Sequence, residues 1–168
     1  DDDPRTRGPN TSKKLSFHTD RCDVIGFMCL KQAKEGGENC VVSSSQLYNQ
    51  IARKRPDLLS ELKQPFYYKR HNVDLGNQSP YCRQPIFSFT AERFACSFLR
   101  VLIDRAYASH ETPVMTARQL KALDFLEEIC EQPENQYRFY LQPGDILLLN
   151  NWTTLHRRSE FVDHADPA

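Results

Sequence analysis

The stretch Leu15-Ser16-Phe17-His18-Thr19-Asp20 places an imidazole and a carboxylate two residues apart, directly after an apolar onset. If this stretch is a β-strand, successive side chains alternate between faces, so His18 and Asp20 point the same way. Two such side chains on one rigid strand can supply two neighbouring ligands of a metal ion. We therefore expect a ligand-bearing strand here, around which the rest of the fold is arranged.

The best candidate for a third ligand is His156, in the segment Asn150-Asn151-Trp152-Thr153-Thr154-Leu155-His156-Arg157-Arg158 near the other end of the chain. Two histidines and one carboxylate on one side of a metal, with the opposite positions open, form the facial triad of non-haem Fe(II) oxygenases. A His-x-Asp pair is also compatible with an ordinary hydrogen-bonded pair, so both interpretations stay open. The remaining histidines, His71, His110 and His164, lie in polar segments and are expected to be solvated or capping residues.

The length and composition favour one domain over residues 1–168. The chain has 22 basic residues (Lys and Arg) and 22 acidic residues (Asp and Glu), so no strong net positive charge attracts nucleic acid. No apolar run approaches the roughly 18 residues of a membrane span, and no signal peptide is visible. The six cysteines include no Cys-x-x-Cys pair and are interpreted as reduced thiols. We expect a cytoplasmic protein without membrane or nucleic-acid partners, and the sequence leaves room for a homo-oligomer.

Apolar or alternating runs, bounded by glycine and proline, predict many short strands and few helices. The runs 23–33 and 146–149 are apolar enough for strands buried on both faces, and Gly36-Gly37 predicts a turn with positive φ. Further strands are predicted at residues 40–43, 65–68, 86–90, 93–98 and 137–142, helices at 46–54, from Pro56 and from Thr116, and loops at 1–14 and 71–83. This order favours a mainly β fold, an antiparallel sandwich or barrel with flanking helices.

Several segments, in this order, resemble the taurine-catabolism dioxygenase (TauD/TfdA-like) family of Fe(II)/2-oxoglutarate-dependent oxygenases. The matching pieces extend over nearly the whole chain, and their order makes the resemblance specific. They are Leu15–Asp20, Gly36-Gly37-Glu38 leading into Val42-Ser43-Ser44, Arg55–Leu59, Gln64-Pro65-Phe66, Pro85-Ile86-Phe87, Pro143-Gly144-Asp145, Asn150-Asn151, His156-Arg157-Arg158 and Phe161-Val162-Asp163.

The resemblance implies a double-stranded β-helix, or jelly roll, that is incomplete at both ends. It also implies that His18, Asp20 and His156 are Fe(II) ligands, with 2-oxoglutarate as the co-substrate. The reaction of this family converts 2-oxoglutarate and O2 to succinate and CO2 while a small organic metabolite is hydroxylated or oxidatively cleaved.

Two departures from the family pattern bear on co-substrate binding. Asn39 stands where many members have a threonine that contacts the far carboxylate of 2-oxoglutarate, so Asn39 is the candidate contact here. The arginine that pairs with that carboxylate lies, by resemblance, on a last core strand beyond residue 168. Two alternatives remain: a non-catalytic jelly-roll fragment or pseudoenzyme, and a cupin-like metal enzyme that uses zinc or manganese without redox chemistry.

Overall fold

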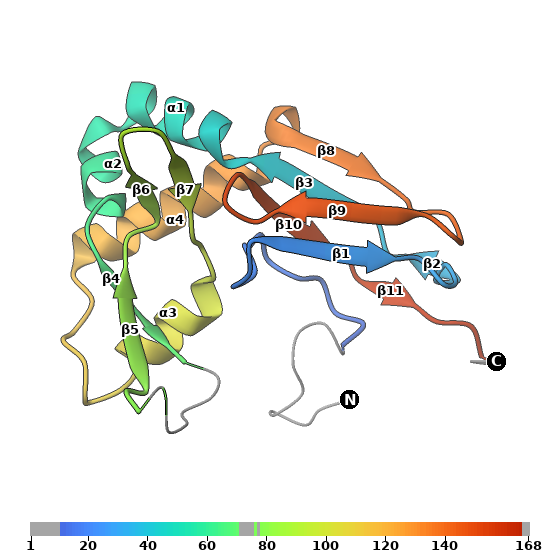
Figure 1. Cartoon of the computed structure of the whole chain (residues 1–168), viewed down its shortest axis with the longest axis horizontal. Coiled ribbons are helices and arrows are strands. Elements are labelled where there is room, and N and C mark those ends of the chain that lie inside the picture. Colours follow the sequence, from blue (N-terminus) through green and yellow to red (C-terminus); the bar gives the residue numbers. More distant parts are fainter. Residues whose placement is uncertain (1–10, 71–75, 77, 166–168) are drawn as a thin grey trace.

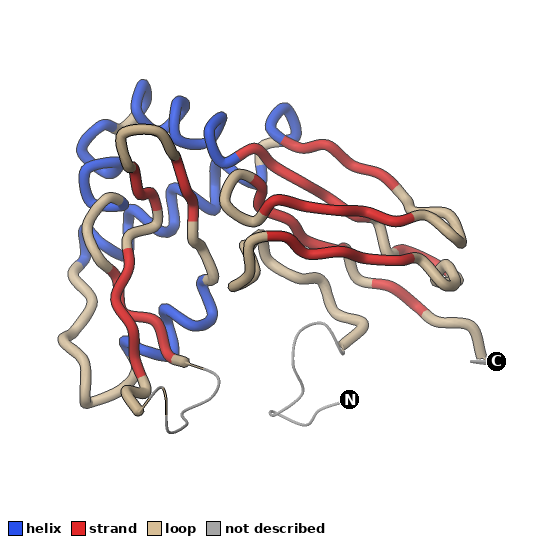
Figure 2. Tube along the Cα trace, viewed as in Figure 1, coloured by secondary structure: helices blue, strands red, loops and turns tan. Residues whose placement is uncertain are grey.

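The computed structural model describes residues 11–70, 76 and 78–165 of the chain. Helices gather at one end of the molecule and most of the longer strands at the other (Figures 1 and 2). Ten of the residues predicted to form an N-terminal loop, 1–10, lie outside the described part. None of the helices in the described part of the chain combines the length and apolar character that a membrane-spanning helix requires.

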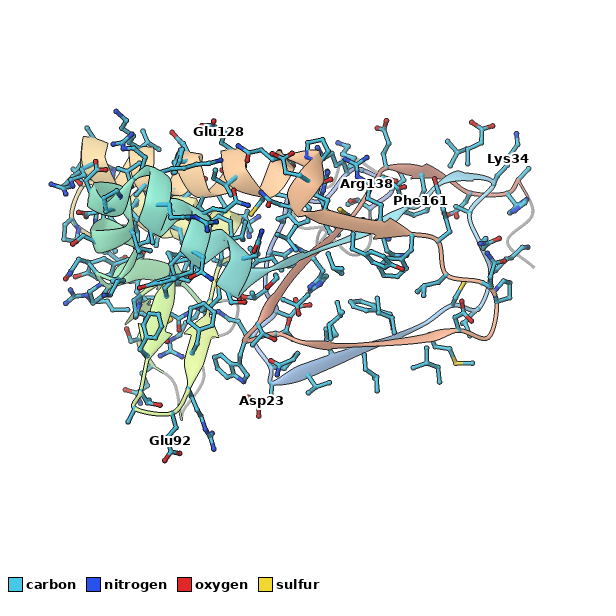
Figure 3. All side chains as sticks on the ribbon, turned by 90° about the horizontal axis from the view of Figure 1, so that it is seen from above. Asp23, Lys34, Glu92, Glu128, Arg138 and Phe161 are labelled. Atoms are coloured by element: carbon cyan, nitrogen blue, oxygen red, sulfur yellow. The ribbon has the colours of Figure 1, made fainter. Side chains whose placement is uncertain are left out.

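The strand-rich end consists of two facing antiparallel layers. The first layer has the order β10-β3-β8, formed by β3 (Asn39–Ser43), β8 (Gln136–Phe139) and β10 (Thr154–Arg158). The second is a ribbon of β1 (Val24–Met28) and β9 (Ile146–Asn150). Seen from above, the ribbon and the three-stranded sheet lie on opposite sides with side chains between them (Figure 3).

A short strand pair extends this end of the molecule. It joins β2 (Glu35–Gly36) to β11 (Phe161–Val162). Gly36 and Gly37 have φ values of 74° and 76°, which confirms the predicted positive φ, but Glu35 and Gly36 form strand β2 where a turn was predicted. A Cβ atom at Gly36 would collide with the backbone oxygen of Glu160, so the close approach of β11 also requires a glycine there.

The helical end is a long insertion between β3 and β8. Helix α1 (Ser44–Lys54) follows β3 directly, because the Ser43 side chain caps it by accepting a hydrogen bond from the Gln46 amide. Helix α4 (Ala117–Glu131) begins with a capping box between Thr116 and Gln119. The other elements of the insertion are α2 (Pro56–Leu62), α3 (Arg100–Tyr107), a 3-10 turn (Pro133–Asn135) and the hairpins β4 (Phe66–Lys69)–β5 (Tyr81–Gln84) and β6 (Phe87–Phe89)–β7 (Phe94–Cys96).

The hydrophobic core joins the insertion to one face of the three-stranded sheet. Cys40 and Val42 of β3 and Leu155 of β10 are buried together with apolar residues of all four helices. The alternate positions of the same strands, including Val41 and His156, face the other way, and the His156 ring lies 5.6 Å from the ring of Phe27 in β1 of the ribbon. The sheet therefore has one face for the core and one face for a site.

Three strand predictions and one loop prediction need correction, and residues 71–75 and 77 of that loop lie outside the described part of the chain. The stretch 15–20 is not a regular strand, because within it only His18 forms an isolated bridge, to His156. The predicted loop 71–83 contains the start of β5 at Tyr81. The runs 23–33 and 146–149 are not buried on both faces: they form β1 and β9, and Val24, Met28, Ile146 and Leu148 on the outer face of the ribbon are exposed. Only the face of the ribbon that lies against the three-stranded sheet is covered, and the other face is exposed to solvent.

Candidate metal centre

Reciprocal backbone hydrogen bonds hold the two histidine-bearing segments together. The His18 amide donates to the His156 carbonyl at 3.1 Å, and the His156 amide donates to the His18 carbonyl at 2.9 Å. His156 lies in the middle of β10, where it is paired with Val41 of β3. The sheet thus fixes the position of the His156 backbone, and the two backbone hydrogen bonds fix the His18 backbone relative to it.

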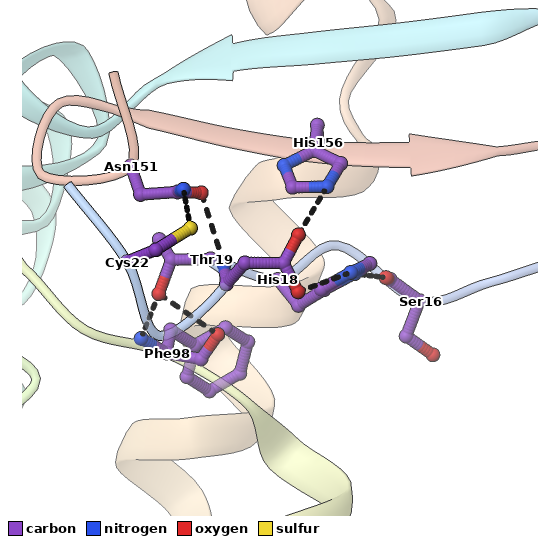
Figure 4. A network of polar contacts seen from close by, with 8 residues as sticks. Ser16, His18, Thr19, Cys22, Phe98, Asn151 and His156 are labelled. Atoms are coloured by element: carbon purple, nitrogen blue, oxygen red, sulfur yellow. Dashed lines mark hydrogen bonds and ion pairs between the residues drawn. The ribbon is translucent and has the colours of Figure 1, made fainter. Parts of the chain in front are cut away.

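The side chains of His18, Asp20 and His156 converge on one point (Figure 4). Asp20 Oδ2 lies 3.3 Å from His156 Nε2, and Asp20 Oδ1 lies 4.0 Å from His18 Nε2. The two imidazole rings are 4.5 Å apart between centroids. One donor atom from each residue falls within 4.8 Å of the others. This is the arrangement that the sequence predicted for these three residues.

The Nδ1 atoms of the two histidines, which point away from Asp20, have different environments. His18 Nδ1 lies 2.8 Å from the carbonyl oxygen of Ser16, which orients the ring and favours the tautomer with an Nε2 lone pair directed at the cluster. His156 Nδ1 is buried and has no hydrogen-bond partner among the described residues. In the metal-free protein a proton on Nε2 satisfies the contact with Asp20, and Nδ1 then needs no acceptor.

Burial and mutual contact set the charge of the cluster. Burial, reinforced by the nearby His156, lowers the pKa of His18 below its ordinary value. The hydrogen bond from His156 lowers the pKa of Asp20, and its carboxylate is the most exposed of the three side chains. Neutral imidazole at His18 and carboxylate at Asp20 are the forms that divalent metals bind. The donor set, two imidazoles and one carboxylate, fits Fe(II).

The residues between and beside the ligands are held by contacts that the sequence analysis did not identify. Thr19, which is buried, donates its amide to the Phe98 carbonyl at 2.7 Å and accepts the Phe98 amide on its hydroxyl at 3.0 Å. Asn151 Oδ1 accepts a hydrogen bond from the Asp20 amide at 3.0 Å. Both residues stand inside quoted motifs, but only the tertiary structure shows their partners.

Other predicted site residues fall in separate places. Asn39 begins β3 and is paired with Arg158, two positions from the Val41–His156 pair, so it lies on the site face of the sheet. Its contact with a co-substrate stays a prediction. His110 and His164 are exposed and do not join the cluster, and His71 lies outside the described residues.

Two facing antiparallel layers, with two imidazoles and one carboxylate gathered between them, define a jelly-roll protein with a two-histidine, one-carboxylate site. Within that class the chain belongs to the taurine catabolism dioxygenase TauD, TfdA family, whose profile matches residues 1–167.

Curated relatives are similar over nearly the whole chain. FR-33289 synthase of Streptomyces rubellomurinus is 33% identical over 161 residues, which cover 95% of this chain and 47% of that protein. Mitochondrial trimethyllysine dioxygenase of Bos taurus is 24% identical over 184 residues, covering 95% of this chain and 40% of that protein. The chain therefore spans less than half of the length of these relatives.

Solved structures confirm the fold predicted from the sequence, mainly β with flanking helices and a jelly-roll core. A structure of asparagine oxygenase with Fe(II), 2S,3S-3-hydroxyasparagine and succinate superposes with a TM-score of 0.69 at 19% identity, covering 95% of this chain and 48% of that one. The non-heme iron oxygenase OrfP in complex with Fe gives a TM-score of 0.65 at 14% identity, with coverage of 94% and 49%.

Proposed function

We propose that the protein is an Fe(II)/2-oxoglutarate-dependent dioxygenase that hydroxylates or oxidatively cleaves a small organic metabolite. The observation that carries the proposal is the convergence of His18, Asp20 and His156, which come from distant parts of the chain. Membership of the family supports the same chemistry.

His18, Asp20 and His156 would hold the iron. When bound, Fe(II) with 2-oxoglutarate and O2 supplies the oxidising power, and the balanced reaction converts a C–H bond to C–OH while 2-oxoglutarate becomes succinate and CO2. The chain's own contribution is to orient three ligands, to keep the His18 imidazole neutral by burial, and to hold the Asp20 carboxylate ionised. Asn39, on the same face of the sheet, is the proposed contact for the far carboxylate of 2-oxoglutarate.

The names of the relatives support a small, charged substrate. Trimethyllysine, γ-butyrobetaine and asparagine, named for three of the similar proteins, are all compact molecules with a carboxylate group. We extend this class, a small metabolite with an anionic group, to the present chain. A cytoplasmic location and a single domain over residues 1–168 remain predictions from the sequence.

The first test is anaerobic addition of Fe(II) to the 168-residue chain, followed by 2-oxoglutarate, with the visible spectrum recorded after each step. A charge-transfer band that needs both additions, and that Asp20→Ala abolishes, supports the proposal. Admission of O2 should then yield succinate.

Other outcomes favour the alternatives. Zinc or manganese in the anaerobically purified protein, without a band, favours a cupin-like metal enzyme. No metal binding at all favours a non-catalytic jelly-roll protein and contradicts the proposal.

A further inference from the structure

We propose that Asn151 is a positioning residue that places Asp20 for metal binding. The inference rests on the proposed metal centre and extends it to a residue that is not a ligand. Asn151 lies in the turn between β9 and β10, five positions before His156, and only 1% of its surface is exposed. A buried amide side chain is normally hydrogen-bonded, so the partners of Asn151 indicate which backbone groups it positions.

Among the described residues, the hydrogen-bond partners of Asn151 lie in the segment that carries Asp20. Its Oδ1 atom accepts from the Asp20 amide at 3.0 Å, and its Nδ2 atom donates to Cys22 Sγ at 3.2 Å. Its own backbone amide donates to the Asp23 carbonyl at 3.0 Å. The three contacts fasten residues 20–23 to the turn that leads into the His156 strand, and Figure 4 shows the two that the Asn151 side chain makes.

These contacts replace a strand ladder that is missing at this point. His18 is held by backbone bonds to His156 and Thr19 by bonds to Phe98, but the amide of Asp20 has neither kind of backbone partner. The Asn151 side chain is its acceptor instead. Without it, the Asp20 amide would lose its acceptor, and the position of Asp20 would depend on the contacts of its neighbours Thr19, Arg21 and Asp23.

The consequence is specific to the metal site. Asp20 reaches His156 through a 3.3 Å contact while its side chain is the least buried of the cluster, so its position depends on the backbone beneath it more than on packing. Groups that orient metal ligands typically change metal affinity by about 10- to 100-fold when removed. Loss of Asn151 should therefore weaken metal binding well beyond its effect on folding.

The test compares Asn151→Ala with Asn135→Ala. Asn135 is also a buried asparagine, and its side chain donates to the Ile129 carbonyl at 2.8 Å in the helical end. Both variants should unfold at lower temperature. In Co(II) titrations followed by the visible absorption of the bound ion, Asn151→Ala should lose about tenfold or more in affinity. Asn135→Ala should stay close to the wild-type affinity.

A second readout needs no metal. Hydrogen exchange measured by NMR should show faster exchange of the Asp20 amide in Asn151→Ala, with the His18 amide still protected. If Asn151→Ala fails to fold, Asn151→Asp takes its place, because it keeps the acceptor oxygen. It should keep protection of the Asp20 amide and the wild-type Co(II) band, and loss of both would overturn the proposal.

The outcomes separate the two proposals. Wild-type chain that binds no Co(II) contradicts the metal centre itself, and with it the role of Asn151. Wild-type binding together with equal affinities for Asn151→Ala and Asn135→Ala overturns only the positioning role. Cys22→Ala should bind Co(II) like the wild type, and a loss as large as that of Asn151→Ala would assign the effect to the Cys22 contact instead of the Asp20 amide.

Discussion

Asp20 Oδ2 and His156 Nε2 lie 3.3 Å apart, although Asp20 belongs to an irregular segment near the start of the chain and His156 to a central position of β10 near its end. This contact exists because the backbone of His18 forms a bridge with that of His156. A single antiparallel bridge therefore brings the two histidines together, with Asp20 two residues further along the same segment.

Replacing Asp20 should remove metal binding and leave the fold intact. The Asp20 side chain is only partly buried, so Asp20→Ala creates no large cavity, while a direct ligand is lost. We expect Co(II) or Fe(II) affinity to fall by more than about 100-fold, beyond the range seen for groups that merely orient ligands. Calorimetric titration and circular dichroism measure the two effects.

The matched control is Asp23→Asn. This residue is three positions further on, and its carboxylate accepts a hydrogen bond from the Trp152 indole at 3.0 Å. It should bind metal like the wild type. Equal losses in the two variants would mean that general negative charge, and not ligation by Asp20, attracts the metal.

The metal-free protein should become less stable as the pH falls through the range below 6.5. Because the pKa of His18 is lowered in the folded protein from its ordinary value of 6.5, the unfolded chain binds more protons there. The contribution of His18 to stability is thus fully present above pH 6.5 and is lost as the pH falls toward the lowered pKa. Urea unfolding of metal-free protein at several pH values, for wild type and His18→Gln, measures it. An identical pH dependence in both proteins would refute the assignment.

Arg100 should be a major stabilising residue of the helical end. Its guanidinium group, mostly buried, contacts Asp104 of its own helix α3 at 2.9 Å, and Asp124 and Glu127 of α4 at 2.9 and 2.8 Å. Burial raises the pKa of Glu127, an effect that Arg100 opposes. Arg100→Ala leaves three carboxylates without their shared cation and should cost about 2 kcal/mol of unfolding free energy.

The comparison for this prediction is Arg105→Ala on the same helix. Arg105 is exposed, so its replacement should change the unfolding free energy by less than about 0.5 kcal/mol. Denaturant unfolding monitored by circular dichroism gives both values. Similar values for the two variants would show that the carboxylate cluster of Arg100 contributes little.

Two leucines at the strand-rich end should respond very differently to truncation. Leu155 of β10 is completely buried in the core, and Leu155→Ala should cost about 2–5 kcal/mol of unfolding free energy. Leu148 of β9 is 68% exposed on the outer face of the ribbon, so Leu148→Ala should cost less than about 1 kcal/mol. A large cost at Leu148 in urea unfolding would mean that another surface covers the ribbon in solution.

Local signals in the sequence were sufficient for much of the secondary structure. Ser43, Pro56 and Thr116 each mark the start of a helix, because N-caps and an N-terminal proline act through neighbouring backbone groups. The positive φ of Gly36 and Gly37 is predictable in the same way, because glycine adopts positive φ without steric cost. These features depend on a few adjacent residues and can be read without the tertiary structure.

Burial and the supports of the site could not be predicted in this way. Whether Leu148 faces a core depends on which layer lies opposite, and an apolar run carries no such information. The three candidate ligands were predicted from their chemistry and from the resemblance, and the structure brings them together. Their supports, Asn151 and Thr19, act through residues that are far away in sequence, so no local pattern reveals them.

The bridge between His18 and His156 also sets the order of events during synthesis. The ribosome makes residue 18 before residue 156, and the whole insertion of helices and hairpins is translated between the two. The insertion can pack as a unit first, because its contacts are closer in sequence, whereas closing such a long loop is slow. The three candidate ligands therefore cannot come together before β10 has been translated, and assembly of the candidate metal centre reports that two distant segments of the chain have paired.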